Sequence, residues 1–211
     1  LDGVNISNMK EEQIAKIRNE KLGFVFQDFM LLDGLNVFEN VCVPKVIHQE
    51  PYRQMETKAE KLLKMFDIAD IAKKFPAEIS GGQKQRAAVA RALITGPKLV
   101  LADEPTGALD SRATDELLRL FAGINRSGQT ILMVTHSVKA ASHAGRVLFI
   151  RDGEVFHQIY RGSSTNEQLY QKISDTLTLL ATQPGRLEVQ NGHTDQQPRA
   201  TQACAGEEGE A

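Results

Sequence analysis

The sequence predicts an α/β protein with a mostly parallel sheet, because apolar runs of strand length alternate with helical patterns. Residues 99–102 and 131–134 are unbroken apolar runs, which are typical of strands buried on both faces of a parallel sheet. Between them, residues 111–125 show the periodicity of an amphipathic helix. Its inward face is expected to carry Leu117, Leu118, Phe121 and Ile124.

The remaining elements are expected on either side of this central unit. Before it, we expect a half-buried strand over residues 1–7, a buried strand over 22–26, and helices over 10–19, 37–46, 58–66 and 83–94. Pro44 is expected to interrupt the second of these helices. After it, Asp152-Gly153 between apolar runs predicts a hairpin, and residues 168–180 have helical spacing. The apolar content falls after Gln183, which predicts a disordered tail.

Composition narrows the class of protein. The 211 residues suffice for one domain with its own core, and the formal net charge of −2 argues against a surface that tracks nucleic-acid phosphates. Cys42 and Cys204 lack the spacing of a metal site or a disulfide framework. No run approaches the roughly 20 apolar residues that span a bilayer. The first residue is Leu1 instead of Met, so we expect the sequence to begin inside a longer protein.

The segment Ser80-Gly81-Gly82-Gln83, at the start of an expected helix, is the first candidate site. Glycines allow a ligand to approach the backbone, and the N–H groups of a first helical turn favour an anion. The hydroxyl of Ser80 adds a further donor. Two adjacent glycines also occur where a turn merely starts a helix, and this alternative stays open.

Polar residues follow each expected buried strand. Asp103 and Glu104 end the first apolar run, where one carboxylate can hold Mg²⁺ and another can orient or deprotonate water. His136 follows the second run and suits contact with a phosphate or with water. Gln27 follows the earlier strand, and its amide oxygen suits Mg²⁺ or water. Each alone has an ordinary interpretation as a loop or surface residue, but together they indicate one site.

These residues resemble the motifs of the ABC transporter nucleotide-binding domain. ISGGQKQR resembles the signature motif, LVLADEP the Walker B strand with its catalytic glutamate, and TGALD the D-loop, while His136 and Gln27 match the switch histidine and the Q-loop glutamine. The resemblance covers residues 1–160 and implies a P-loop NTPase-like sheet with a helical signature subdomain over about residues 28–95. A C-terminal helix over 161–183 and a disordered tail over 184–211 are expected to follow.

The resemblance also implies roles for these residues. Glu104 and His136 are expected to be catalytic, and Asp103 and Gln27 to contact Mg²⁺. The residues expected to face ATP are Gln27, Ser80, Gly81, Gly82, Gln83 and Asp110. The implied partners are a second ATPase subunit, expected to be an identical copy whose nucleotide faces Ser80, and an integral-membrane permease. The protein is therefore expected at the cytoplasmic face of the plasma membrane, with no nucleic-acid partner.

Longer stretches resemble the ATPases that work with FtsX-like permeases. These stretches are residues 19–41, the D-loop and residues 131–155, while the expected helix over 168–180 is most similar to bacitracin or antimicrobial-peptide exporters. The implied cargo is a peptide, an antibiotic or a lipid-like compound. Residues 29–32 are the candidate contact with the permease, and ordinary core packing is the alternative.

The family's G-x-x-x-x-G-K-[ST] loop, which supplies most phosphate contacts, occurs nowhere in the 211 residues. The resemblance places this loop, with its strand and helix, before Leu1. Two explanations stay open: the sequence is part of an intact gene product, or the gene product is truly shortened. We expect the 211 residues alone to hydrolyse ATP little or not at all. An ABC ATPase outside transport, and a regulatory partner that contributes only its signature face, remain as alternatives.

Overall fold

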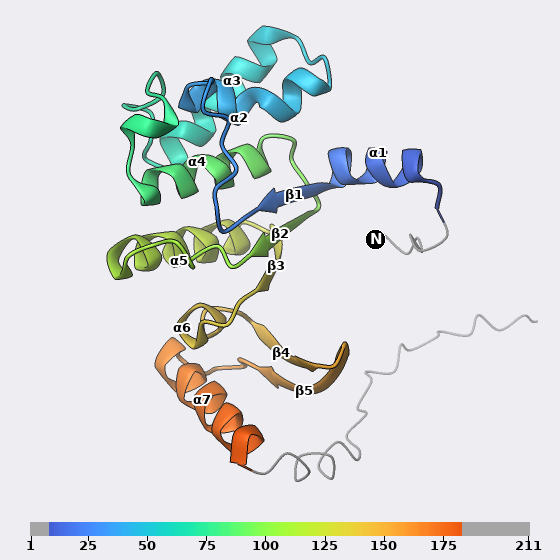
Figure 1. Cartoon of the computed structure of the whole chain (residues 1–211), viewed down its shortest axis with the longest axis vertical. Coiled ribbons are helices and arrows are strands. Elements are labelled where there is room, and N and C mark those ends of the chain that lie inside the picture. The colour runs from blue at the N-terminus through green and yellow to red at the C-terminus, as the bar shows by residue number, and fades with distance from the viewer. Residues whose placement is uncertain (1–8, 183–211) are drawn as a thin grey trace, which may run out of the picture.

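Three parallel strands form a sheet in the order β1-β2-β3 at the middle of the molecule (Figure 1). They are β1 (Leu22–Val25), β2 (Leu99–Asp103) and β3 (Thr130–Val134). The predicted α/β fold with a parallel sheet is therefore confirmed. The computed structural model describes residues 9–182, so the strand expected over 1–7 and the tail expected over 184–211 lie outside the described residues.

Three of the helices that precede β2 gather at one end of the molecule, beyond the sheet (Figure 1). They are α2 (Val37–Ile47), α3 (Tyr52–Met65) and α4 (Gly81–Leu93), with a short 3-10 turn over Pro76–Glu78. Two further helices lie next to the strands: α1 (Glu11–Lys21) leads into β1, and α5 (Ser111–Arg126) connects β2 to β3. The signature segment, Ser80-Gly81-Gly82-Gln83, lies at the start of α4, and this helix packs against β1.

The main core extends from α2, α3 and α4 across the sheet to α5. α4 buries four alanines, Ala87, Ala88, Ala90 and Ala92, whose small side chains let the helix lie close to β1. A Cβ atom at Gly23 would lie 2.3 Å from the carbonyl oxygen of Ala92, so only glycine fits at this point of β1. The predicted inward face of α5 is confirmed, because Leu117, Leu118, Phe121 and Ile124 are all buried.

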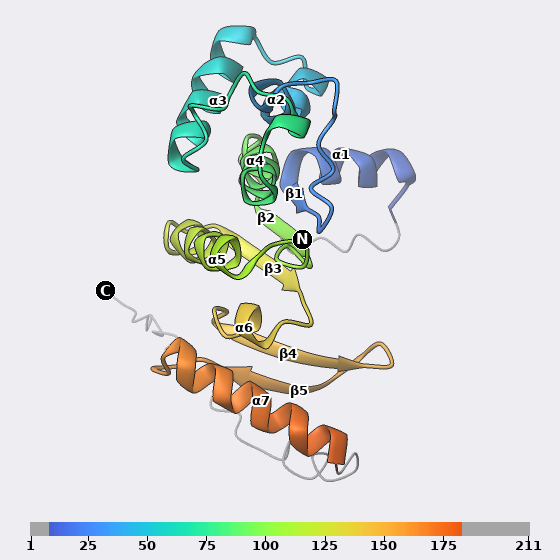
Figure 2. The same cartoon turned by 60° about the vertical axis from the view of Figure 1, so that its left-hand side comes forward.

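A hairpin and two helices form a second unit at the opposite end (Figures 1 and 2). β4 (Arg146–Arg151) and β5 (Glu154–Tyr160) are antiparallel and turn at Asp152 and Gly153, both with positive φ, as the sequence predicts. α7 (Asn166–Thr182), the helix expected near residues 168–180, packs Leu169 and Ile173 against Phe149 in a separate small core. The short helix α6 (Val138–Ala141) contacts α7.

The prediction that the central strands are buried on both faces is wrong. In β3, Ile131 and Met133 pack against the main core, but Leu132 and Val134 are 51% and 60% exposed. β2 alternates in the same way, with Val100 buried and its neighbours only half-buried. An apolar run predicts that a strand forms, but it does not predict whether other elements cover one face of that strand or both.

Two helix predictions are corrected as well. Pro44 does not interrupt α2, which continues to Ile47. Near the end of the helix, the missing N–H of Pro44 costs only the single bond to the carbonyl of Asn40. α3 begins at Tyr52, directly after Pro51, instead of at residue 58. Proline is well suited to a helix start, because its fixed φ is already close to the helical value.

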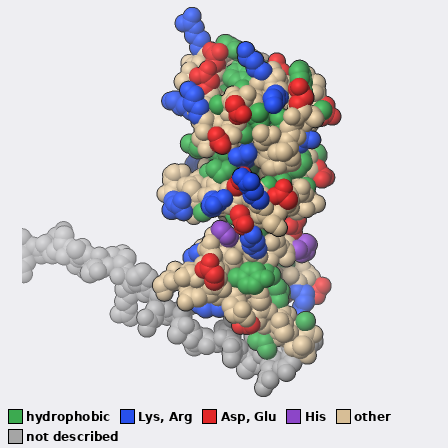
Figure 3. All heavy atoms as spheres, turned by 90° about the vertical axis from the view of Figure 1, so that its left-hand side faces the viewer, with side chains coloured by type: hydrophobic (Ala, Val, Ile, Leu, Met, Phe, Trp, Pro, Cys, Tyr) green, Lys and Arg blue, Asp and Glu red, His purple; other side chains and the backbone are tan. Residues whose placement is uncertain are grey.

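The surface carries mixed charge on the face that Figure 3 shows. Basic and acidic side chains are interspersed there, and neither sign forms an extended region. Within residues 9–182, none of the helices combines the length and the apolar character that crossing a bilayer requires.

Candidate functional site

Glu104 lies just after β2 and joins the ends of two neighbouring strands. Its backbone N–H donates to the carbonyl of Val134 at 2.9 Å. Its carboxylate accepts hydrogen bonds from the Thr135 hydroxyl at 2.9 Å and from the His136 backbone N–H at 2.5 Å. Glu104 also has a positive φ of 42°, a conformation that is costly for a residue with a side chain. The carboxylate is therefore held in one place by two hydrogen bonds, and the backbone that carries it by a third.

His136 and Asp103 lie at the same edge of the sheet. The His136 ring is fully exposed, and its Nε2 atom lies 3.9 Å from Oε1 of Glu104. Asp103 is the last residue of β2, pairs in register with Val134 and is exposed. The structure thus brings together the predicted residues Asp103, Glu104 and His136, as expected for the carboxyl ends of parallel strands.

Gln27 follows β1 and packs against the turn before α5. A Cβ atom at Gly107 would lie 2.9 Å from Cδ of Gln27, so the absence of a side chain at Gly107 lets the amide approach this turn. Gln27 is therefore linked to the predicted D-loop by direct packing. Within residues 9–182, no group of three or more His, Cys, Asp or Glu side chains is placed to hold a metal ion.

The predicted Mg²⁺ contacts, Asp103 and Gln27, are hard oxygen donors of the kind that Mg²⁺ accepts. Two such side chains are too few for a resident ion. They do fit an ion that arrives with nucleotide phosphates, because Mg²⁺ usually keeps waters and binds one or two protein oxygens in such sites.

The signature segment is arranged as a reciprocal helix cap. The Ser80 hydroxyl accepts from the Gln83 N–H at 3.3 Å, and the Gln83 side-chain oxygen accepts from the Ser80 N–H at 2.9 Å. Asp110 similarly caps α5, accepting from the Ala113 N–H at 2.8 Å. A Cβ atom at Gly82 would lie 3.0 Å from Cβ of Ala113, so this glycine allows the two helix starts to lie side by side. The polar side chains of this segment thus stabilise its backbone.

A cavity of about 330 Å³ lies at these two helix starts. Its wall includes Ser80, Gly81, Gly82, Leu109, Asp110 and Arg112. Asp103, Glu104 and His136 do not line this cavity. The structure therefore separates the predicted residues into two groups: one at the carboxyl edge of the sheet, and one at the start of α4.

Gln85 is a buried connector that the sequence analysis missed. Its side-chain nitrogen donates to the carbonyl of Pro105 at 2.8 Å and to that of Phe26 at 3.2 Å, and the residue is completely buried. It thereby ties α4 to the chain just after β1 and just after β2. The available signal was a polar residue on the face of α4 that also carries buried alanines.

Residues 29–32 form a constrained loop over α4. Phe29 and Met30 both have positive φ, and the Arg91 guanidinium of α4 donates to both of their carbonyls, to that of Phe29 at 2.8 Å. Burial lowers the pKa of Arg91. Met30 and Leu32 are exposed, whereas Leu31 packs against the main core. The loop thus combines core packing with an exposed apolar surface.

A sheet with acidic groups at its carboxyl edge, beside a helix that begins with glycines at a cavity, is typical of α/β domains that bind nucleotides. A family model described as "ABC transporter" matches residues 1–107, just over half of the chain. The chain therefore belongs to the ABC transporter family of ATP-binding proteins, which are ATPases.

Curated relatives agree with this family. The ATP-binding protein YxdL of Bacillus subtilis is 44% identical over 181 residues, covering 85% of this chain and 70% of the relative. The bacitracin export ATP-binding protein BceA of Halalkalibacterium halodurans is 40% identical over 194 residues, covering 92% and 74%. The macrolide export protein MacB of a Shewanella strain is 43% identical over 155 residues, covering 74% of this chain and 24% of the relative.

Solved structures agree as well. The dimeric, post-hydrolysis form of the ATP-binding cassette MJ0796 with ADP and phosphate matches with a TM-score of 0.68 and 34% identity, covering 76% of this chain and 71% of that one. The fold of the described residues is therefore that of an ABC ATPase cassette.

Proposed function

We propose that the chain is the ATP-binding subunit of an exporter. It couples ATP hydrolysis to the export of a peptide, an antibiotic or a lipid-like compound through an FtsX-like permease. Relatives named for bacitracin export and macrolide export support this assignment. The exposed apolar side chains of Met30 and Leu32, on a loop that Arg91 holds in shape, support a permease contact at residues 29–32.

The placement of the Glu104 carboxylate carries the catalytic part of the proposal. Fixed by Thr135 and the His136 N–H, it is positioned to accept a proton from an attacking water. The exposed His136 ring, 3.9 Å away, is free to approach a phosphate oxygen. Mg²⁺, contacted through Asp103 and Gln27, would neutralise phosphate charge when it is bound with ATP.

A homodimer explains why the two groups of site residues lie apart. Ser80, Gly81, Gly82, Gln83 and Asp110 would face a nucleotide held by the second copy, while Glu104 acts on the chain's own side. The first turn of α4 suits a phosphate for this purpose, because the N-terminus of a helix favours an anion. The dimeric form of MJ0796 supports this arrangement.

We further propose a division into an ATPase domain over residues 1–160, a C-terminal helix over 161–183 and a tail over 184–211. The helical subdomain over about residues 28–95 corresponds to the group of α2, α3 and α4. Attachment to the permease would hold the protein at the cytoplasmic face of the plasma membrane.

The test is ATP hydrolysis by a version of the protein that carries the glycine-rich loop. Glu104→Gln should abolish turnover but leave ATP binding intact, and should accumulate an ATP-bound dimer visible by size-exclusion chromatography. Unchanged turnover in this variant would remove Glu104 from the catalytic role. Glu154→Gln, at the distant hairpin, serves as the matched control and should behave as the unsubstituted protein.

A second candidate function is that of a non-hydrolysing partner that offers only its signature face, where Ser80, Gly81 and Gly82 line a cavity of about 330 Å³. Purified 211-residue chain should show little or no turnover. Turnover that is lost on Glu104→Gln would exclude this alternative.

A further inference from the structure

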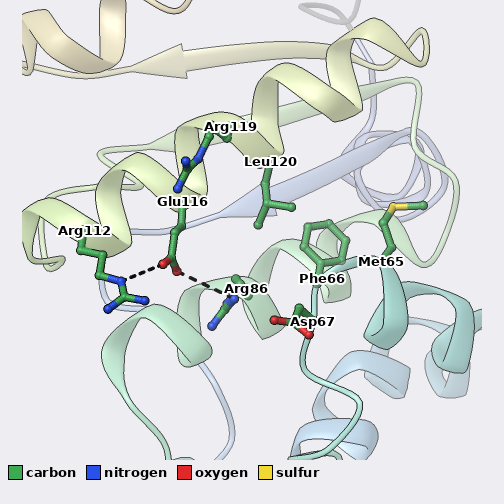
Figure 4. Close-up of a pocket in the computed structure, with 8 residues that line it drawn as sticks. All are labelled: Met65, Phe66, Asp67, Arg86, Arg112, Glu116, Arg119 and Leu120. Carbon is green, nitrogen blue, oxygen red and sulfur yellow. Dashed lines mark hydrogen bonds and ion pairs between the residues drawn. The ribbon is translucent and has the colours of Figure 1, made fainter.

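A second and larger cavity lies next to the cavity at the start of α4. It has a volume of about 510 Å³ and opens where the end of α3 meets α4 and α5 (Figure 4). Its polar wall carries three arginines, Arg86 from α4 and Arg112 and Arg119 from α5, against the two carboxylates Asp67 and Glu116. The cavity wall therefore has a net positive charge.

The arginines offer more hydrogen-bond donors than the nearby carboxylates can use. Glu116 is shared, with Arg112 Nε at 3.2 Å from one oxygen and Arg86 at 4.0 Å from the other (Figure 4). Each guanidinium carries five N–H donors, so one carboxylate cannot satisfy both.

Two observations indicate that the arginines of this cavity have too few hydrogen-bond acceptors and negative charges near them. The Nε atom of Arg86 is buried and has no hydrogen-bond partner, which is unusual because a buried donor without a partner is costly. Asp115, one turn before Arg119 on α5, is paired with Lys139 at 2.5 Å, so its negative charge is shared between Lys139 and Arg119.

The other wall of the cavity is apolar. Met65, Phe66 and Leu120 form it, and Figure 4 shows them on the side opposite Arg112. Met65 is 62% exposed, so its side chain is accessible to a ligand. A ligand that fills the cavity therefore needs an anionic group at one end and an apolar body at the other.

We propose that this cavity binds a small phosphorylated molecule with an apolar body. Its phosphate would bind the guanidinium groups of Arg86 and Arg119, whose planar forks match phosphate oxygens. Its apolar part would lie on Met65 and Leu120. The volume is within the range of small-molecule sites.

The proposed ligand site shares a wall with the signature cavity. Arg86, Arg112 and Glu116 line both cavities. A bound phosphate would compete with Glu116 for the guanidinium groups. The carboxylate of Glu116 would then lose its ion pairs, which would change the charge beside Ser80 and Gly81. The site is a place where a metabolite can act on the signature segment, and its existence does not depend on the proposed export function.

The experiment is a calorimetric titration of the 211-residue chain with phenyl phosphate and, separately, with inorganic phosphate at constant ionic strength. Phenyl phosphate should bind more tightly, because only it reaches the apolar wall. Equal affinities, or no binding, would overturn the proposal. Arg119→Gln should weaken binding of phenyl phosphate by about tenfold or more, the size expected for one charged hydrogen bond.

Two further variants make the test specific. Glu116→Gln should tighten binding, because it removes the negative charge that competes for the arginines. Arg126→Gln, at the end of α5 and outside the cavity wall, is the matched control and should bind as the unsubstituted chain does. A loss in Arg126→Gln equal to that in Arg119→Gln, or weaker binding in Glu116→Gln, contradicts the proposed site. Circular dichroism of each variant establishes that it is folded.

Discussion

The hydroxyl of Thr135 donates a 2.9 Å hydrogen bond to Oε2 of Glu104, across the ends of β2 and β3. The same hydroxyl accepts from the N–H of Ser137 at 3.0 Å, so its orientation is fixed on both sides. Thr135 is therefore the side chain that aims the carboxylate on which the proposed reaction depends.

Replacing Thr135 with valine should slow hydrolysis without weakening ATP binding. Valine keeps the shape but removes the bond, and a hydrogen bond to a charged group is worth roughly 1.5–3 kcal/mol, or about tenfold or more in rate. In a protein that carries the glycine-rich loop, kcat should fall while KM stays the same. Thr135→Ser should restore the rate, and a rate in Thr135→Val equal to that of the parent would show that the bond is dispensable.

Gly23→Ala should destabilise the fold by about 1–3 kcal/mol, the usual cost of forcing extra volume into a packed core. The new methyl group would lie 2.3 Å from the Ala92 carbonyl oxygen and 3.1 Å from Cγ of Pro97, so the backbone of Ala92 and the ring of Pro97 leave little room for relaxation. Urea unfolding measures the loss. Gly34→Ala is the control, and its midpoint should be almost unchanged, since among residues 9–182 nothing but its two chain neighbours lies within 4 Å of the position that its Cβ would take. Similar midpoints for both variants would contradict close packing at Gly23.

Arg91→Lys should loosen residues 29–32 without unfolding the molecule. Lysine keeps the charge but lacks the fork that holds the carbonyls of Phe29 and Met30, two residues with positive φ. Hydrogen exchange of the amides over residues 29–32 should accelerate by about tenfold or more. Arg53→Lys, on the exposed side of α3, should leave these rates unchanged. Unaltered exchange in Arg91→Lys would mean that the loop keeps its shape without the arginine.

Cys42 should react slowly with iodoacetamide at pH 8. Burial, together with the nearby carboxylates of Glu39 and Glu56, raises the pKa of its thiol to about 11. Because the pKa is raised, the thiol stays protonated until the pH approaches that value, and the thiolate is the reactive form. Mass spectrometry of a Cys204→Ser variant isolates this residue. Labelling should become fast in urea, and fast labelling in the folded chain would show that Cys42 is accessible.

Local sequence patterns predicted the helices, strands and turns. The burial of each face and the hydrogen bonds of the site depend on how these elements pack together, which local patterns do not show. The face of α5 and the Asp152-Gly153 turn follow from short-range periodicity and turn chemistry, so both were predictable. The exposure of Leu132 was not, because it depends on what covers β3. In the site, the sequence did not reveal that the Ser80 hydroxyl accepts from the Gln83 N–H, a bond that leaves its O–H able to donate to a ligand as predicted. Thr135 was passed over because a threonine after a strand has no distinctive signal until Glu104 is placed beside it.

The buried amide of Gln85 has a mechanical consequence. Its two hydrogen bonds attach α4 to the chain after β1 and to the loop after β2. A sliding movement of α4 across the sheet has to break both bonds, whereas a tilt of the helix and the sheet as one body breaks neither. We therefore expect the glycines at the start of α4 to move together with the ends of β1 and β2, as parts of one rigid body.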